Sequence, residues 1–364
     1  MSDFLTELRR EVVGAHTAHR RRSRLRRAVR GLWRPGPLLG AAAAALALLA
    51  LVVGVRALRA PEPTGGPRVL GVVDLGGNPV DGAFHDGSLW VADFRDDAIV
   101  RLDPVRRRIQ SRIRLRGEPG AIAAGGGGLW VRTWRSGGDR RTDVSHIDSG
   151  SERVVARVTT GFGWSIAVGP DTVWAAKTEV PPEGIDGIDA RTAERTRLVR
   201  VPHVYGLAAT AGALWALMGD GTVVQADATT GRVQQRWPQL AVSNPDVDNE
   251  NSIVADDRGA WVLASGMGVR ALLVRVEDGE ATKRIPVDPQ ALPVVTAAFR
   301  GVWIASRPEP RGPYRLSRLD PATGETTASV AIGIHRPVAL VPAGDVLCAV
   351  SGGGSVVVVD PGDD

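Results

Sequence analysis

Two arginines and a tryptophan, Arg132, Trp134 and Arg135, stand close together in the run LWVRTWRSGG. An arginine side chain holds carboxylates and phosphates through a planar fork of N–H donors. A tryptophan ring stacks on flat apolar groups and attracts cations over its face. These residue types predict that the segment binds an anionic or aromatic ligand and does not catalyse a reaction on it.

Four further binding candidates, Trp164, His203, Tyr205 and Arg336, lie in or beside short apolar runs farther along the chain. His203, in VPHVYGLAA, is the candidate catalytic residue, because an imidazole exchanges protons near neutral pH. A lyase or hydrolase also needs an acid or a metal to stabilise the developing charge. No such set assembles around His203 in the sequence, so the catalytic residues stay unassigned and a structural role for this histidine is favoured.

The motifs of several enzyme classes are missing from the sequence. It contains no CxxC, HExxH or GxSxG motif, and GGGG at 125–128 reads as a turn between strands, since no helix follows it. The one cysteine, Cys348, is expected to be a small core residue. We therefore expect no metal and no cofactor.

The elements that would position these residues repeat along the chain. Six short strands carry a tryptophan at a spacing of about 40 residues, and a seventh copy, DVLCAV, is aligned with Leu347 at the tryptophan position. A period of this length indicates one supersecondary unit copied in tandem. The tryptophans are expected to pack between neighbouring units: Trp90, Trp130, Trp174, Trp215, Trp261 and Trp303.

Each repeat reads as four short strands cut by Gly, Pro and Asp, which is the composition of a propeller blade. We predict an all-β fold, a seven-bladed β-propeller of four-stranded antiparallel blades over residues 68–364, preceded by one transmembrane helix. The C-terminal repeat lacks its outermost strand, and RVLGVVDL at 68–75 is expected to supply it and close the ring.

Strands a to d of a blade run outward from the axis, so that the b–c and d–a loops share one face and the a–b and c–d turns the other. The a–b turns are short and bland, whereas the b–c loops vary in length and carry charge. The b–c/d–a face is therefore the predicted binding face. Besides the seven binding candidates, it is expected to carry Asp81, Arg95, Arg140, Arg141, Lys177, Glu179, Asn251, Arg307, Arg311, Tyr314 and His335.

The repeat pattern, an apolar strand, LWV and then RLDPxTG, resembles that of the YVTN and virginiamycin B lyase-like seven-bladed propellers over about residues 68–364. The resemblance implies a propeller; for the lyases it also implies a PHGIA…LWFTE pattern with a histidine before the inner strand and an acid after the Trp strand. Here the histidine is kept at His203 and partly at His335, and the acid only as Asp93. The resemblance therefore favours the fold more than the lyase activity.

Residues 35–55 hold no charge and are long enough to cross a bilayer as a helix. Ten arginines against three acidic residues stand in 1–34, and two arginines follow shortly after the span. The positive-inside rule then predicts a basic cytoplasmic tail over 1–34, a transmembrane helix over 35–55, a linker over 56–67 and an extracytoplasmic propeller in the cell membrane. A cleaved signal peptide is the rival interpretation, although this apolar run is too long for one.

The basic character of the chain belongs to its N-terminal tail. The tail carries +7 while the whole chain carries +5, so the propeller is slightly acidic. Membrane lipid is the expected partner of the tail and span, and no nucleic-acid partner is expected. The leading hypothesis is a membrane-anchored binding or interaction module with an unknown ligand or protein on the b–c loop face; the alternatives are a lyase or hydrolase at the channel mouth and the ectodomain of a sensor.

Overall fold

The computed structural model describes residues 65–135, 141–178, 183–240, 253–266, 269–287, 294–307 and 312–362, with the backbone alone for 264–266 and 269–271. The expected tail and transmembrane helix, most of the linker, and Arg140, Glu179, Asn251 and Arg311 lie outside the described residues. Within those ranges no helix has the length and apolar character needed to cross a membrane.

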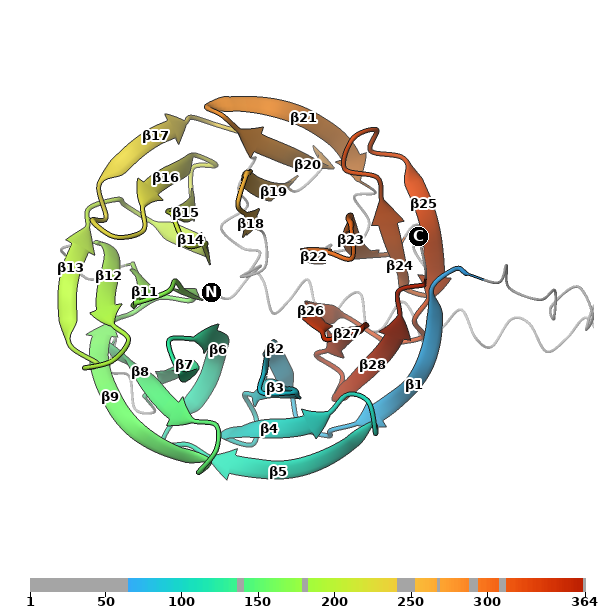
Figure 1. The fold of residues 1–364 in the computed structure, drawn as a ribbon, viewed down its shortest axis with the longest axis horizontal. Coiled ribbons are helices and arrows are strands. Elements are labelled where there is room, and N and C mark those ends of the chain that lie inside the picture. The colour runs from blue at the N-terminus through green and yellow to red at the C-terminus, as the bar shows by residue number, and fades with distance from the viewer. Residues whose placement is uncertain are drawn as a thin grey trace, which may run out of the picture. The chain divides into compact units, whose positions relative to one another are not determined.

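The described residues form seven four-stranded antiparallel sheets arranged around one axis (Figure 1). In each sheet the strands follow one another from the inside outward. The first four blades are β2(Pro79–His85), β3(Ser88–Asp93), β4(Ala98–Asp103), β5(Arg108–Arg114); β6(Glu118–Gly125), β7(Gly128–Trp134), β8(Arg141–Asp148), β9(Arg153–Gly161); β10(Ile166–Val168), β11(Thr172–Lys177), β12(Gly184–Asp189), β13(Arg195–Val199); and β14(Val204–Ala209), β15(Ala213–Met218), β16(Val223–Asp227), β17(Val233–Trp237). The last three are β18(Ile253–Asp256), β19(Gly259–Gly266), β20(Val269–Glu277), β21(Glu280–Val287); β22(Val294–Ala298), β23(Gly301–Ser306), β24(Arg315–Leu319), β25(Thr326–Ala331); and β26(Pro337–Ala343), β27(Val346–Ser351), β28(Ser355–Asp360) with β1(Arg68–Asp74).

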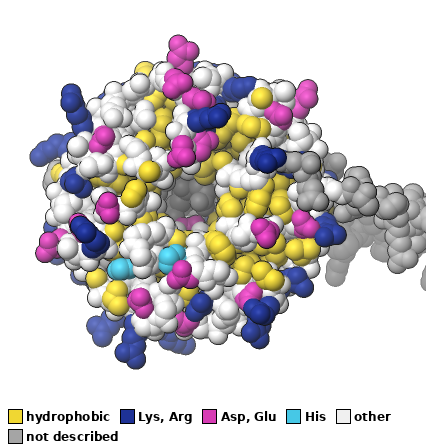
Figure 2. Space-filling view, in the orientation of Figure 1, with side chains coloured by type: hydrophobic (Ala, Val, Ile, Leu, Met, Phe, Trp, Pro, Cys, Tyr) yellow, Lys and Arg dark blue, Asp and Glu magenta, His cyan; other side chains and the backbone are white. Residues whose placement is uncertain are grey.

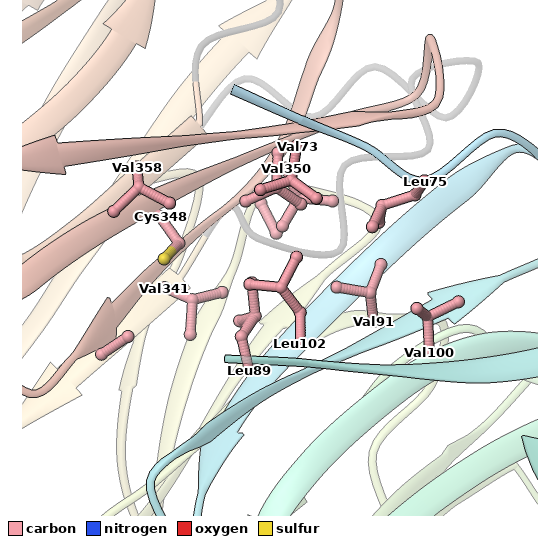
Figure 3. Packing of buried hydrophobic residues seen from close by; sticks show 13 residues of the cluster. Val73, Leu75, Leu89, Val91, Val100, Leu102, Val341, Cys348, Val350 and Val358 are labelled. Atoms are coloured by element: carbon pink, nitrogen blue, oxygen red, sulfur yellow. The ribbon is translucent and has the colours of Figure 1, made fainter. Parts of the chain in front are cut away.

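The ring closes as predicted, because β1 pairs with β28 from Arg68 opposite Asp360 to Asp74 opposite Ser355. The N-terminal strand thus completes blade 7 and covers what would be an open sheet edge. Figure 3 shows the core beneath this closure, where Val73, Val350 and Val358 of blade 7 pack toward Leu89 and Leu102 of blade 1. The described part of Gly65–Asp364 therefore holds every blade and its own apolar core.

The repeated tryptophans are core residues, as expected. Trp90 is fully buried and packs with Ile122, Leu129 and Val131 of the next blade. The adjacent c strand of the same blade covers several of these rings: Arg101 lies over Trp90 at 4.9 Å, and His146 stacks on Trp130 at 4.3 Å. The repeat therefore identifies the fold and leaves the ligand open.

One residue of the predicted repeat is misaligned. In blade 1 the tryptophan position pairs with Ala83, and the equivalent partner in blade 7, Val341, faces Cys348. Cys348 therefore occupies the tryptophan position, and Leu347 is equivalent to Leu89. Burial raises the pKa of the Cys348 thiol to about 12.

The c–d turns are held by their aspartates, as the sequence indicated. The Asp227 carboxylate accepts hydrogen bonds from the Thr229 and Thr230 amides, and Asp189 binds the Arg191 and Thr192 amides in the same way. These donors hold the pKa of Asp227 and of Asp189 below the usual 3.8. The view of Figure 1 looks onto these turns, so the b–c/d–a face lies away from the viewer.

Candidate functional site

Four partly exposed aromatic residues form a continuous chain on the b–c/d–a face. Phe94 lies in the b–c loop of blade 1, Trp134 ends β7, and Phe162 and Trp164 lie in the loop between blades 2 and 3. Ring centroids are 5.5 Å apart for Phe94 and Trp134, 4.6 Å for Trp134 and Trp164, and 5.3 Å for Phe162 and Trp164, all edge to face. This is the geometry that aromatic rings prefer, and it leaves faces and edges open to a ligand.

Local structure explains how the chain of rings is held. Gly120 stands at the bulge of β6, where an added Cβ would lie 2.9 Å from the Trp134 ring. The absence of a side chain at Gly120 therefore leaves the space that the ring occupies. The Trp134 Nε1–H also donates to the Gly163 carbonyl at 3.4 Å, next to Trp164. Trp134 and Trp164 were predicted separately as binding residues, and the structure brings their rings into contact. Phe94 and Phe162 were not predicted. Each is an aromatic residue in a loop outside the Trp repeat, and that position is the signal that could have identified them.

Arg132 is corrected from a ligand contact to a buried structural group. Its side chain has no exposed surface. The guanidinium donates to the Thr142 hydroxyl at 3.1 Å, the Ser165 carbonyl at 3.0 Å and the Gly161 carbonyl at 2.7 Å. Along a strand successive side chains alternate between faces, and here Arg132 points into the blade interface. It ties the loop that carries Trp164 to blade 2.

Arg135 is exposed at the edge of the aromatic chain. Its Nε and Nη2 donate to the two oxygens of Asp143 at 3.1 and 2.8 Å, and Nη2 also donates to the Thr159 hydroxyl at 2.9 Å. Asp143 itself is buried. A two-point arginine–carboxylate pair fixes the plane of the guanidinium. Arg135 therefore presents an oriented cation beside Trp134.

His203 and Tyr205 line a hollow of about 300 Å³ on the same face. The hollow lies between the start of β14 and the turn that follows β15. Met218 and Asp220 complete its wall. The His203 backbone adopts φ 45°, its N–H donates to Glu183 Oε2 at 3.1 Å, and its Nδ1 lies 3.7 Å from the same oxygen. The imidazole is about two-thirds exposed, so it is held through its main chain and opens to solvent.

The acid of the lyase-like pattern is not brought to this histidine. Asp93 belongs to blade 1 and His203 precedes the inner strand of blade 4. Asp93 is fully buried, and its Oδ1 accepts hydrogen bonds from the amides of Asn78 and Asp96. Lys177, at the equivalent position of blade 3, is also buried, 3.8 Å from Asp186. Both side chains therefore serve the structure of their own blades.

Arg336 lies in a different sector, before the inner strand of blade 7. It is exposed with φ 48°, and its carbonyl accepts the Gly352 amide at 3.0 Å. Arg307, in blade 6, lies over the Tyr314 ring at 5.4 Å. The structure thus gathers Trp134, Arg135 and Trp164 into one patch, places His203 and Tyr205 in a separate hollow, and sets Arg336 apart from both. In the described ranges no group of three or more His, Cys, Asp or Glu is placed to hold a metal ion.

Comparisons with known proteins support the architecture alone. No protein-family model matches the sequence, and no curated protein matches it. Among solved structures, a chain of Kuenenia stuttgartiensis hydrazine synthase is similar, with a TM-score of 0.61 and 14% identity, over 79% of this chain and 96% of that chain. At this identity the likeness shows a shared propeller fold and no shared activity.

Proposed function

We propose that this chain is a membrane-anchored, extracytoplasmic binding module whose ligand lies on the aromatic chain of Phe94, Trp134, Trp164 and Phe162. The single observation that carries the proposal is this edge-to-face chain of partly exposed rings, outside the structural Trp repeat. Rigid aromatic side chains supply contact area at low cost in conformational entropy. The ligand class that fits them presents a flat apolar or aromatic group.

Saturation-transfer NMR tests this proposal with a set of small aromatic fragments and their cyclohexyl analogues. We expect aromatic fragments to bind more tightly than the saturated analogues, because the edges of Trp134 and Trp164 favour a π system. Trp134→Ala should lower binding at least tenfold while leaving the thermal midpoint within a few degrees. Val105→Ala, on an exposed turn of blade 1, is the control. Absence of binding, or binding that Trp134→Ala leaves unchanged, would refute the proposal.

The proposed topology rests on the uncharged run 35–55 and the arginines before it. Alkaline phosphatase fused after Asp364 is expected to be active, since it folds only outside the cytoplasm. A fusion at residue 34 should be inactive. Activity of a cytoplasm-only reporter after Asp364 would contradict the proposed orientation.

The second candidate is a hydrolase or lyase at the His203 hollow. The observation in its favour is that Glu183 and Asp220 both lie near His203. Hydrogen bonds from Thr222 lower the Asp220 pKa, and the nearby His203 adds the smallest contribution in the same direction. A histidine between carboxylates is suited to proton transfer. Opening of a cyclic depsipeptide lactone by the purified protein, abolished by His203→Ala, would establish this activity and displace the binding-module proposal.

A further inference from the structure

The outer rim of blades 7, 1 and 2 differs from the rest of the molecule. We define this rim by β1, β5 and β9 with the turn at 104–107. The exposed large hydrophobic side chains among the described residues all lie on it: Val69, Val72, Val105, Ile109 and Val155, the third of them 71% exposed. Scattered exposed apolar side chains are ordinary, but their concentration in one sector indicates an interaction surface.

Arginines surround these apolar residues. Nine exposed arginines against one exposed acid, Asp74, lie on the rim and the residues just after β5: Arg68, Arg106, Arg107, Arg108, Arg112, Arg114, Arg116, Arg153 and Arg157. β21 and β25, with the turns before them, expose Asp278, Glu280 and Glu325 against Arg284. The outer strands of blades 3 and 4 with their turns also expose arginines, but no large hydrophobic side chain among the described residues of these two blades is exposed. The rim of blades 7, 1 and 2 is therefore distinguished by the combination of arginines with exposed apolar side chains.

The three strands form one surface. Arg112 of β5 donates from Nη2 to the Leu75 carbonyl at 2.5 Å, which joins blade 1 to the end of β1. Arg101 of blade 1 pairs with Glu152 of blade 2 at 2.9 Å. Figure 1 shows β1, β5 and β9 succeeding one another along the lower edge, and Figure 2 shows Lys and Arg side chains gathered along that edge.

We propose that this rim lies on an anionic lipid membrane, so that the ring stands with its edge toward the bilayer. Arginines attract the anionic headgroups, and single apolar side chains between them enter the headgroup boundary. A nucleic-acid duplex would match the charge but offers little to accommodate Val72, Val105 and Val155. The surface is therefore matched to a membrane by two properties at once.

The entry point of the chain agrees with this occupant. β1 is the first strand of the propeller and lies on the rim itself. The stretch 56–67 spans at most about 40 Å when fully extended, so a bilayer crossed by 35–55 would be within reach of the rim. This one step rests on the proposed anchor; the apolar and charged residues of the rim do not depend on it.

An environment-sensitive fluorophore on the full-length protein tests the proposal. Cys348 is fully buried, so a thiol reagent labels the introduced cysteine of Val105→Cys on the rim, or of the control Gln234→Cys on the exposed side of β17. With vesicles containing 30% phosphatidylserine we expect a blue shift of the Val105→Cys label, reversed by high salt, and none with phosphatidylcholine alone. The Gln234→Cys label should not respond to either lipid.

Charge variants in the Val105→Cys background make the test quantitative. Each arginine near an anionic surface raises the membrane-binding equilibrium constant about fivefold. Arg108→Gln with Arg114→Gln should therefore lower the ratio of docked to undocked label about 25-fold. Neither arginine has a side-chain partner among the described residues, so the fold should tolerate the change. The matched control is Arg232→Gln with Arg236→Gln on blade 4, expected to change the ratio less than twofold.

Several results would overturn the proposal: no shift of the rim label on anionic vesicles, an equal shift of the Gln234→Cys label, or an equal loss from the blade 4 pair. Tighter binding to duplex DNA than to vesicles, sensitive to the same rim variants, would assign the surface to nucleic acid. Trp134→Ala, which tests the binding-module proposal, should leave docking unchanged, so the two proposals fail separately.

Discussion

Arg132 and Trp134 stand two residues apart on β7, and replacing each by alanine should have opposite consequences. Arg132 is fully buried, with hydrogen bonds to Thr142, Ser165 and Gly161. Arg132→Ala removes three hydrogen bonds made by a charged donor, each of which contributes about 1.5–3 kcal/mol. The Ser165 and Gly161 carbonyls keep a second donor, the Ala176 amide and the Thr142 hydroxyl. Because these acceptors stay partly satisfied, we expect a loss of about 3–5 kcal/mol in the free energy of unfolding.

For a domain of this size the midpoint falls by about 2 °C or somewhat more per kcal/mol, so differential scanning calorimetry should show a decrease of roughly 6–10 °C. Arg132→Lys should recover only part of this, since an ammonium lacks the planar fork. The control is Arg141→Ala, an exposed arginine on the adjacent strand β8, expected to change stability by less than about 0.5 kcal/mol. A midpoint for Arg132→Ala within 2 °C of wild type would refute the assignment of Arg132 to the interior.

Three further outcomes are expected. Deleting residues 65–74 removes β1 and exposes the β28 edge, so the midpoint should fall by more than 10 °C and size-exclusion chromatography should show self-association; a monomer of unchanged stability would contradict closure by this strand. Asp189 and Asp227 have pKa values lowered in the folded state, so their contribution to the free energy of unfolding is present above the unfolded pKa near 3.8 and is lost as pH falls below it. Asp189→Asn with Asp227→Asn should flatten the curve of thermal midpoint against pH between pH 5 and about 3. An unchanged curve would argue against these turns as the source of the pH dependence. Cys348, with its pKa raised to about 12, should react with a thiol reagent at pH 8 only as fast as the protein unfolds, and rapid labelling of the native protein would show that blade 7 opens.

The architecture could be predicted from the sequence because its signals are local and repeated. Each blade carries its own tryptophan, apolar runs and aspartate turn, and a position misread in one copy is corrected by the others. The substitution of Cys348 for a tryptophan shows the limit: where one copy departs from the pattern, only strand pairing identifies the equivalent residue. Closure by 68–74 also followed from the sequence, since a missing strand at one end had a candidate at the other.

The candidate site depended on which side of a strand each residue faces and on which loops of different blades meet. By composition, Arg132 and Arg135 are equivalent neighbours of Trp134, yet one is buried among backbone carbonyls and the other is exposed beside Asp143. Phe94 and Phe162 are about 70 residues apart in the chain and meet the same tryptophan pair. Repeats and turn residues act over a few neighbours, so the sequence by itself determined the blades and their number. The aromatic chain and the basic rim arise from side chains of different blades, and only the closing of the ring decided them.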